Sequence, residues 1–275
     1  PANVALTLGR LGRPVALATW FGADTLGRLI DFHMNDSGVH VTPASRGASH
    51  TSTALARLDE NGAASYTFDL EWAPAAPIEV PETAQILEAG SISAIIEPGA
   101  SAVLDALARG REHALVFFDP NARPSIMGEP AVALVSLERF IALADVVKVS
   151  DEDIEWLTGG APIDKVVDRW LRMGPSLVVV TRGKHGSDVA TASGLRFTKT
   201  TSDVKVVDTV GAGDSFMGGM IDAMWGMGLR GADARETLSA LPEEQVRAII
   251  DRASAVSDVT VSRKGANPPW AHELS

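Results

Sequence analysis

The sequence predicts an α/β fold in which a doubly wound, mostly parallel β-sheet is flanked by helices and carries a small β lid. Two apolar runs, at 114–118 and 177–180, and the short β-branched segment 146–149, which includes Lys148, indicate strands that are buried on both faces. Segments with helical spacing separate these runs, as connections between parallel strands require. Two further strand-like segments lie close together in the chain, which is typical of an antiparallel hairpin outside the parallel sheet.

The first part of the chain is predicted to alternate helix and strand. Apolar residues among small ones indicate a buried helix over residues 3–12. Residues 15–21 are predicted to form a buried strand. The helical spacing of apolar residues over 26–34 predicts a second helix, which Gly38 closes.

Residues 39–72 interrupt this alternation. The segments 51–58 and 64–70 have the composition of strands, and residues 59–62 between them have the composition of a hairpin turn. We expect this antiparallel ribbon to form a lid over about residues 45–72. An ordinary hairpin at the edge of a sheet is the alternative.

Alternation of strand and helix returns after residue 89 and continues through most of the remaining chain. Helical crossovers between buried strands are what a parallel sheet needs. The expected strands span 90–96, 114–118, 146–149 and 177–180, and the expected helices span 100–109, 151–157 and 163–173.

The composition excludes several classes of function. The 275-residue chain carries 24 Lys and Arg against 35 Asp and Glu, a formal net charge of −11, and an acidic chain without a basic cluster binds nucleic acid and anionic membranes poorly. The absence of cysteine excludes thiol catalysis, Cys-based zinc sites and iron–sulfur clusters. No apolar run approaches the length of about 18 residues that a membrane helix needs. We therefore expect a cytoplasmic protein with no nucleic-acid or membrane partner.

The strongest candidate for a functional site is Gly211-Ala212-Gly213-Asp214, directly before a helix with an apolar face. A turn of this kind leaves the amides of its first three residues free to face an anion, and the helix N-terminus adds about half a positive charge. The carboxylate of Asp214 can reach the same space. Asp is also common as a cap or first-turn residue of a helix, so both interpretations stay open.

An anion cradle beside a carboxylate is the arrangement that phosphoryl transfer to an alcohol needs. Other phosphate motifs do not match: residues 183–185 lack the remaining residues of a P-loop, and residues 211–216 fail the third position of the dinucleotide fingerprint. No segment matches the catalytic loop of protein kinases. The acidic run at 151–155 lacks the glycine of an EF-hand and suits the first turn of a helix.

The segment 208–219, DTVGAGDSFMGG, resembles the C-terminal signature of the ribokinase-like (PfkB) carbohydrate kinases. The resemblance extends through most of the chain, and within the family the sequence is most similar to bacterial fructokinases. The other matching segments are 1–12, 22–24, 119–123, 180–183 and 261–266, and the segments most similar to fructokinases are 119–124, 148–153 and 265–270.

The resemblance implies one ribokinase-like kinase domain over residues 1–275, which transfers the γ-phosphoryl group of ATP to a terminal hydroxyl of a monosaccharide, with fructose as the first candidate. It implies that Asp214 is the base and that Gly211, Ala212 and Gly213 form the anion hole. The implied contacts of the sugar are Asn3, Asp24, Glu97 and Arg123.

The resemblance also implies that ATP is used with Mg²⁺ and with a monovalent cation such as K⁺. Asp153 would order Mg²⁺ through water, and Asp208 with the carbonyls of Val210 and Gly265 would hold the monovalent cation. The lid is implied to form a homodimer contact. The implied contacts of the nucleotide are Lys148, Ser150, Thr181, Gly183, Gly213, Ser257 and Asn267.

The sequence departs from the family pattern in two places. The family's Asn-x-x-Glu is Ser150-Asp-Glu-Asp153 here, with the carboxylate on a shorter arm. The family usually begins earlier, with a core strand that bears a sugar-binding Asp, a lid strand and two glycines before Pro1. Alternative hypotheses are the same chemistry with 2-keto-3-deoxygluconate, ribose or a nucleoside as acceptor, and a non-catalytic sugar-binding relative.

Overall fold

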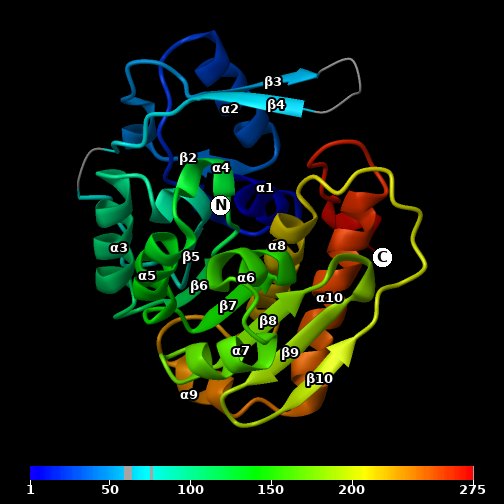
Figure 1. Ribbon diagram of the computed structural model, residues 1–275. Helices are drawn as coiled ribbons and strands as arrows, with labels where there is room; N and C mark the ends of the chain where they lie inside the picture. Colours follow the sequence, from blue (N-terminus) through cyan, green and yellow to red (C-terminus); the bar gives the residue numbers. More distant parts are fainter. Residues whose placement is uncertain (59–63, 75–76, 275) are drawn as a thin grey trace.

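The computed structural model describes residues 1–58, 64–74 and 77–274 of the chain. Its centre is a six-stranded sheet with helices packed on both faces, and a smaller β ribbon lies beyond one end of this sheet (Figure 1). The expected α/β class is confirmed. In the part of the chain that the structure describes, no helix is long and apolar enough to cross a membrane.

The central sheet has a parallel part and an antiparallel edge. Its strands are β5 (Ile86–Gly90), β6 (Leu115–Asp119), β7 (Val146–Ser150), β8 (Leu177–Thr181), β9 (Ser187–Thr191) and β10 (Arg196–Lys199). Strands β5 to β8 pair in parallel in chain order, whereas β9 runs antiparallel to β8 and β10 runs antiparallel to β9. The order across the sheet is β10-β9-β8-β7-β6-β5.

The parallel strands divide their side chains between two apolar cores. Phe117 and Val146 face one side of the sheet, and Phe118 and Val147 face the other, because successive side chains of a strand point to opposite faces. Burial on both faces explains why these strands are mostly apolar in sequence, although Glu88 interrupts β5 and Lys148 interrupts β7.

Each core is closed by its own set of helices. One face is covered by α3 (Gly99–Gly110), α4 (Pro124–Met127), α5 (Pro130–Ile141), α6 (Asp151–Thr158) and α7 (Ile163–Leu171). The other face is covered by α1 (Ala2–Arg10), α8 (Ala212–Gly226), α9 (Ala234–Ser239) and α10 (Glu243–Val261).

Helix α8 packs against both α1 and α10, and two adjacent glycines allow both neighbours to come close. A Cβ atom on Gly218 would lie 2.6 Å from Cγ2 of Thr7 in α1. A Cβ atom on Gly219 would lie 2.7 Å from Cα of Ala253 in α10. Neither position has room for a side chain, so the glycine pair sets how closely the two helices approach α8.

Helices α1 and α8 are also joined by polar contacts near both ends of α8. At its start, the Asn3 amide donates to the Asp214 carboxylate at 2.8 Å. About two turns further on, the buried Asp222 carboxylate accepts from Arg13, just after α1, at 2.6 Å and from Arg252 of α10 at 2.7 Å. These two guanidinium groups balance the buried charge of Asp222, which would otherwise be strongly destabilising.

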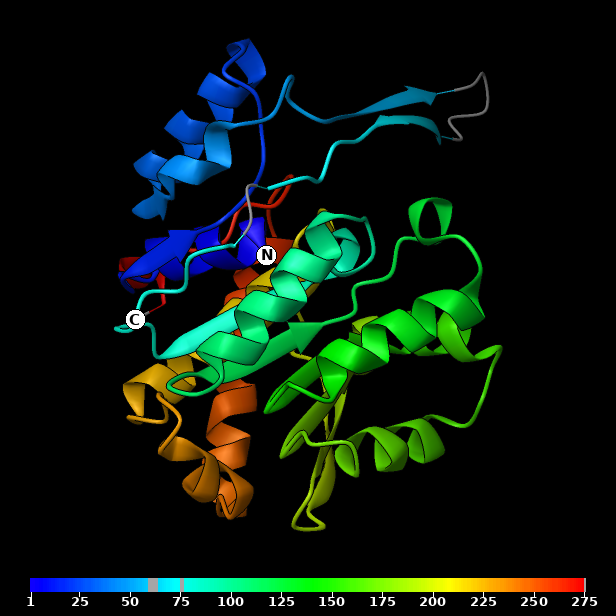
Figure 2. The ribbon, with the colours of Figure 1, turned by 90° about the vertical axis from the view of Figure 1, so that its left-hand side faces the viewer.

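The ribbon that the sequence predicts as a lid is an antiparallel hairpin. Strand β3 (Thr53–Leu58) pairs with β4 (Ala64–Asp69). Strands β1 (Val15–Leu17) and β2 (Val39–Val41) form a separate parallel pair, which packs with α2 (Thr25–Asp36). The hairpin and α2 lie at the top of both views, above the end of the central sheet near which α4 lies (Figures 1 and 2).

The strand predicted at 90–96 is wrong. Strand β5 ends at Gly90, and Ser91–Ala94 form a 3₁₀ helix. Ser91 has a φ of 57°, which ends the extended conformation. The polar Glu88 in the middle of the true strand hides its pattern in the sequence, so the prediction falls on the next apolar segment.

The strand predicted at 15–21 is shorter than expected. Only β1 pairs with a neighbouring strand, because the chain then turns toward another segment, where the Phe21 amide donates to the Ser45 carbonyl at 2.9 Å. The turn predicted at 59–62 lies outside the described residues. The remaining short 3₁₀ helices are Pro43–Arg46, Gly183–His185 and Ala271–Glu273.

Candidate active site

Polar segments meet at the carboxyl ends of the parallel strands. Strand β6 ends at Asp119, β7 at Ser150 and β8 at Thr181. The start of α8 lies at the same end of the sheet, because Asp214 is hydrogen-bonded to Asn121 of the loop after β6. Ligands of open α/β sheets bind at this end.

The Asp214 carboxylate is held by two side-chain amides from different elements. Nδ2 of Asn3 in α1 donates to Oδ2 at 2.8 Å, and Nδ2 of Asn121 donates to Oδ1 at 3.2 Å. Asp214 is half-buried in the first turn of α8, whose N-cap is Gly211. Asp214 is therefore a first-turn residue rather than the cap, and each of its oxygens keeps a lone pair that can accept a further hydrogen bond.

The glycine turn before Asp214 leaves amide groups for a ligand. Gly211 has a φ of 78°, which glycine adopts without strain, and a Cβ atom there would lie 2.7 Å from Cβ of Ala266. Among the described residues, the amides of Gly211 and Gly213 have no hydrogen-bond partner, whereas the Ala212 amide donates to the Thr209 carbonyl at 3.2 Å. Two of the three expected anion-hole amides are therefore unengaged.

A buried ion pair lies directly behind this turn. Nζ of Lys148 is 2.7 Å from Oδ2 of Asp119, and the two residues are 3% and 2% exposed. A Cβ atom on Gly213 would lie 2.7 Å from the same Nζ, which places the ammonium group against the turn. Burial alone lowers the pKa of Lys148, but the carboxylates of Asp119, Asp214 and Asp153 together outweigh it, and the pKa lies above its ordinary value. Lys148 is thus a positive group behind the predicted anion hole.

Ser150 and Asp153 form a capping box at the start of α6. The Asp153 amide donates to Oγ of Ser150 at 3.0 Å, and the Ser150 amide donates to Oδ2 of Asp153 at 3.3 Å. Oδ1 of Asp153 accepts from the Ala122 amide at 2.9 Å. The acidic run at 151–155 therefore begins a helix, as the sequence predicts.

The contacts of Asp153 decide whether this residue has a free lone pair with which to order the expected Mg²⁺. Among the described residues, no group of three or more His, Cys, Asp or Glu is arranged to hold a metal ion by itself. Mg²⁺ at a nucleotide keeps several waters and needs only one or two carboxylates beside the phosphates. Asp153 fits this smaller demand, because each oxygen keeps a second lone pair beyond its bond to a backbone amide.

The three residues predicted to hold a monovalent cation lie together. Oδ1 of Asp208 accepts from the Val210 amide at 3.0 Å, and Oδ2 accepts from the Gly265 amide at 2.8 Å. These two amides hold the pKa of Asp208 below its usual range. Asp208 therefore joins the loop before α8 to the loop after α10 through an ionised carboxylate.

The predicted nucleotide contacts border the same end of the sheet. Oγ of Ser257 donates to the Ala212 carbonyl at 3.1 Å, beside the glycine turn. Thr181 lies opposite Ser150 in the register of β7 and β8. Gly183 is exposed just after β8, with a φ of 48°. In the segment after α10, Oδ1 of Asn267 accepts from Arg10 at 2.6 Å.

The predicted sugar contacts do not all reach Asp214. Oδ1 of Asp24 accepts from the Gly27 amide and Oδ2 accepts from the Thr51 amide, each at 2.8 Å, so Asp24 caps α2. These bonds, the one from Gly27 above all, lower the pKa of Asp24 to about 2. Glu97 is exposed and accepts from Ser101 in α3.

Arg123, the remaining predicted sugar contact, is exposed and donates to the carbonyls of Asn121 and Ala122. Of the four predicted sugar contacts, Asn3 alone is hydrogen-bonded to Asp214 in the part of the chain that the structure describes. The other three have polar partners in their own neighbourhood.

Sequence reasoning missed two residues of this site. Asp119 holds Lys148, and Asn121 holds Asp214. Both lie in the polar segment 119–123 directly after a buried strand, at the edge of a parallel sheet where ligands bind. That position is a usable signal, but their partners are distant in the chain.

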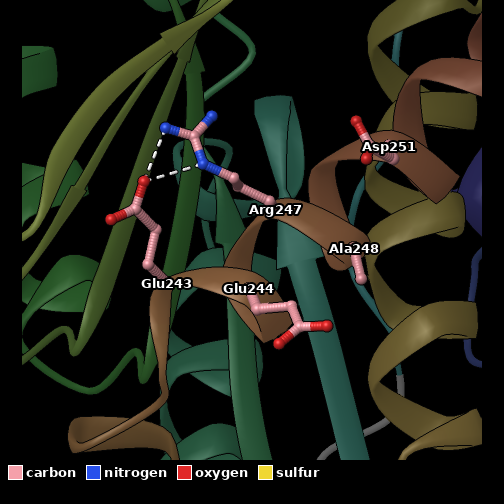
Figure 3. A pocket seen from close by; sticks show the side chains of 5 residues that line it. All are labelled: Glu243, Glu244, Arg247, Ala248 and Asp251. Atoms are coloured by element: carbon pink, nitrogen blue, oxygen red, sulfur yellow. Dashed lines mark hydrogen bonds and ion pairs between the residues drawn. The ribbon is translucent and has the colours of Figure 1, made fainter.

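A separate hollow of about 490 Å³ lies along α10 (Figure 3). Arg247 is paired with Glu243 of the same helix, and Asp251 is paired with Lys199. This is the pattern of a solvated helix face, and we assign it no part in the chemistry. The side chains that line it are Glu243, Glu244, Arg247, Ala248 and Asp251.

Comparison with known proteins gives the family of this chain. The family of pfkB carbohydrate kinases matches residues 1–273. The chain belongs to the PfkB family of carbohydrate kinases. This confirms the resemblance found in the sequence, and the ribokinase-like fold with its central, mostly parallel sheet agrees with it.

Relatives of this PfkB kinase include enzymes with different acceptors. A fructokinase from Rhizobium leguminosarum bv. trifolii is 32% identical over 228 residues, which cover 81% of this chain and 69% of the relative. A solved fructokinase from Vibrio cholerae O395, with fructose, ADP and calcium ion bound, has a TM-score of 0.75 at 29% identity, over 97% of this chain and 85% of that one. Aminoimidazole riboside kinase from Salmonella enterica, complexed with aminoimidazole riboside and an ATP analog, has a TM-score of 0.81 at 26% identity, over 99% and 89% of the two chains.

Proposed function

We propose that this PfkB kinase is an ATP-dependent fructokinase, which transfers the γ-phosphoryl group to a terminal hydroxyl of fructose. The observation that carries the proposal is Asp214, held by Asn3 and Asn121 beside a glycine turn with unengaged amides. The relatives named fructokinase, at 32% and 29% identity, support fructose as the acceptor.

In this proposal Asp214 is the catalytic base. It accepts the proton of the attacking hydroxyl while the hydroxyl oxygen forms a bond to the γ-phosphorus. The bond from that phosphorus to the β–γ bridging oxygen breaks, and ADP leaves with the electron pair. The amides of Gly211 and Gly213 bind the oxygens of the transferring group, and Lys148 adds positive charge behind them. The Ala212 amide contributes after it releases the Thr209 carbonyl.

The support for the four proposed sugar contacts differs from residue to residue. Asn3 is placed by its bond to Asp214, so that a sugar hydroxyl near the base would lie beside its amide. Asp24, Glu97 and Arg123 remain proposed sugar contacts on the family pattern. Each of them would exchange or share its present partners on binding.

ATP is proposed to lie along the loops that follow β7, β8 and α10. Mg²⁺, when bound through water to Asp153, would neutralise charge on the phosphates. Asp208, with the carbonyls of Val210 and Gly265, is the proposed site of a monovalent cation such as K⁺. The proposed nucleotide contacts are Lys148, Ser150, Thr181, Gly183, Gly213, Ser257 and Asn267.

The β3–β4 hairpin is proposed to act as the lid of a single kinase domain, within about residues 45–72. A lid excludes water, which would otherwise hydrolyse ATP. Leu55 on β3 is 54% exposed, and we propose that it lies in a homodimer contact made through the lid. Because the phosphoryl donor is ATP, we propose a cytoplasmic location.

The proposal is tested by following ADP release and sugar phosphate formation with fructose. Asp214→Ala is expected to lower kcat by about 100-fold to 10,000-fold, the usual contribution of a general base. Asp203→Ala, in the exposed loop before α8, is the matched control and should keep the wild-type kcat. An Asp214→Ala variant with wild-type kcat would refute the assignment of the base.

A panel of acceptors distinguishes the second candidate. The similarity to aminoimidazole riboside kinase favours a nucleoside acceptor as that candidate. Fructose, 2-keto-3-deoxygluconate, ribose and aminoimidazole riboside are compared by kcat/KM. If kcat/KM is highest for fructose, the proposal is supported. If it is highest for another acceptor, that acceptor is the substrate instead of fructose.

A further inference from the structure

The turn after β6 has an unusual backbone. Among the described residues, Ser91 and Asn121 are the two residues other than glycine with positive φ, at 57° and 36°. They touch each other, because Oγ of Ser91 donates to the Asn121 carbonyl at 3.0 Å. A backbone of this kind is unfavourable and persists where surrounding contacts enforce it, often at functional sites.

Those contacts surround Asn121. Asp119 is held by Lys148 at 2.7 Å, and the Ala122 amide donates to Asp153 at 2.9 Å. In the adjacent strand β5, Gly90 packs closely against the residue that begins this turn. A Cβ atom on Gly90 would lie 2.0 Å from the Asp119 carbonyl oxygen. The backbone of Asn121 is therefore fixed on both sides.

The fixed backbone directs the Asn121 side chain to Asp214. A carboxylate only accepts hydrogen bonds, so Asn121 presents its NH₂ group to Oδ1, at 3.2 Å, just as Asn3 presents its own to Oδ2. One amide on each oxygen fixes the plane of the carboxylate. The remaining lone pair on each oxygen therefore points in a fixed direction.

We infer that Asn121 is a positioning residue for Asp214, held in a strained turn by Ser91 so that the carboxylate presents its lone pair to the acceptor hydroxyl. The inference rests on the proposed function, in which Asp214 is the base. Asn121 acts through Asp214 and does not bind the sugar, so its loss lowers kcat and leaves KM for the sugar unchanged.

The test uses glycine at both strained positions, since glycine accepts positive φ and removes only the side chain. Asn121→Gly is expected to fold with a Tm near that of the wild type, and to lower kcat about tenfold or more while KM stays within about twofold. Ser91→Gly is expected to lower kcat in the same way by a smaller factor. Kinetics use the acceptor with the highest kcat/KM in the wild type.

A double-mutant cycle separates positioning from other roles. In the Asp214→Asn background, Asn121→Gly should change the residual rate by less than about twofold, because the carboxylate through which it acts is gone. An unchanged kcat in Asn121→Gly, a raised KM at wild-type kcat, or an equal loss in the Asp214→Asn background would each overturn the inference alone. A wild type without turnover on any acceptor would overturn the proposed function and this inference together.

Discussion

Nζ of Lys148 lies 2.7 Å from the point that a Cβ atom on Gly213 would occupy. The same Nζ is held by Asp119 at 2.7 Å, so it cannot move aside without breaking a buried ion pair. The first turn of α8 is therefore packed against a fixed positive charge.

Gly213→Ala should disturb this packing. The new methyl group would push Lys148 from Asp119 or lift the glycine turn, and a small displacement of a positioned group costs about tenfold or more in rate. We expect a lower kcat and a lower Tm, measured by steady-state kinetics and thermal unfolding. Gly226→Ala, at the other end of α8, is the control, since its methyl group would make an ordinary contact of 3.7 Å with Arg13. Equal kinetics for the two variants would contradict the prediction.

Substitutions of Lys148 and Asp119 should show whether Lys148 contributes to catalysis as well as to the stability of the fold. The single variant Lys148→Met leaves Asp119 buried without a counter-charge, which costs about 3–5 kcal/mol of the free energy of unfolding. Adding Asp119→Leu removes that unpaired charge, so we expect the double variant to regain most of the stability in urea unfolding. Its kcat should stay low and its KM for ATP high, because the positive charge behind the turn is still missing. A stable double variant with wild-type kinetics would show that Lys148 is only structural.

Glu88→Gln should change how stability depends on pH. Oε1 of Glu88 is buried without a hydrogen-bond partner among the described residues, and burial raises the pKa of this carboxyl from 4.5 to about 7. A raised pKa in the folded state means that its stability contribution is fully present below about pH 4.5 and is lost as the pH rises through about 7. The loss is about 3 kcal/mol at high pH.

Glutamine stays neutral at every pH, so the variant should have a higher Tm than the wild type at pH 8 and nearly the same Tm at pH 5. Glu112→Gln is the matched control, because Glu112 is exposed. A Tm gain of the same size at both pH values would contradict the assigned cause.

Asp208→Ala should weaken activation by K⁺. The variant removes the carboxylate that joins Val210 and Gly265, two of the proposed cation ligands. We expect the K⁺ concentration for half-maximal rate to rise by about 10-fold to 100-fold, the usual effect of losing a group that orders a cation site. Rates are measured against KCl at constant ionic strength. A wild-type rate that is independent of K⁺ would remove the cation from the mechanism.

Strands β6, β7 and β8 could be predicted because burial on both faces leaves runs that are mostly apolar, as at Val146 and Val147. Strand β5 could not be predicted, because Glu88 interrupts its apolar pattern and the apolar residues after Gly90 form a 3₁₀ helix instead. A short strand with a polar residue at its centre is therefore easily displaced, in a prediction from local pattern, by a neighbouring apolar segment.

The glycine turn could be predicted because its residues are neighbours in sequence. Asn121 could not, because its contact with Asp214 joins positions 93 residues apart, which only the topology brings together. Asp24 shows a further limit: an acidic residue before a helix suits a ligand contact and a cap equally well, and only its bonds to Gly27 and Thr51 show that it caps α2.

The ties between α1 and α8 have a mechanical consequence. Asn3 meets Asp214 at one end, and Arg13 meets Asp222 about 12 Å further along the helix axis. Because Thr7 packs directly against Gly218 between these two contacts, we expect the two helices to move together as one rigid unit. We expect a tilt of the helices at Asp222 to displace Asp214 as well, so that loss of the Arg13–Asp222 ion pair lowers turnover although it lies about 12 Å from the proposed base.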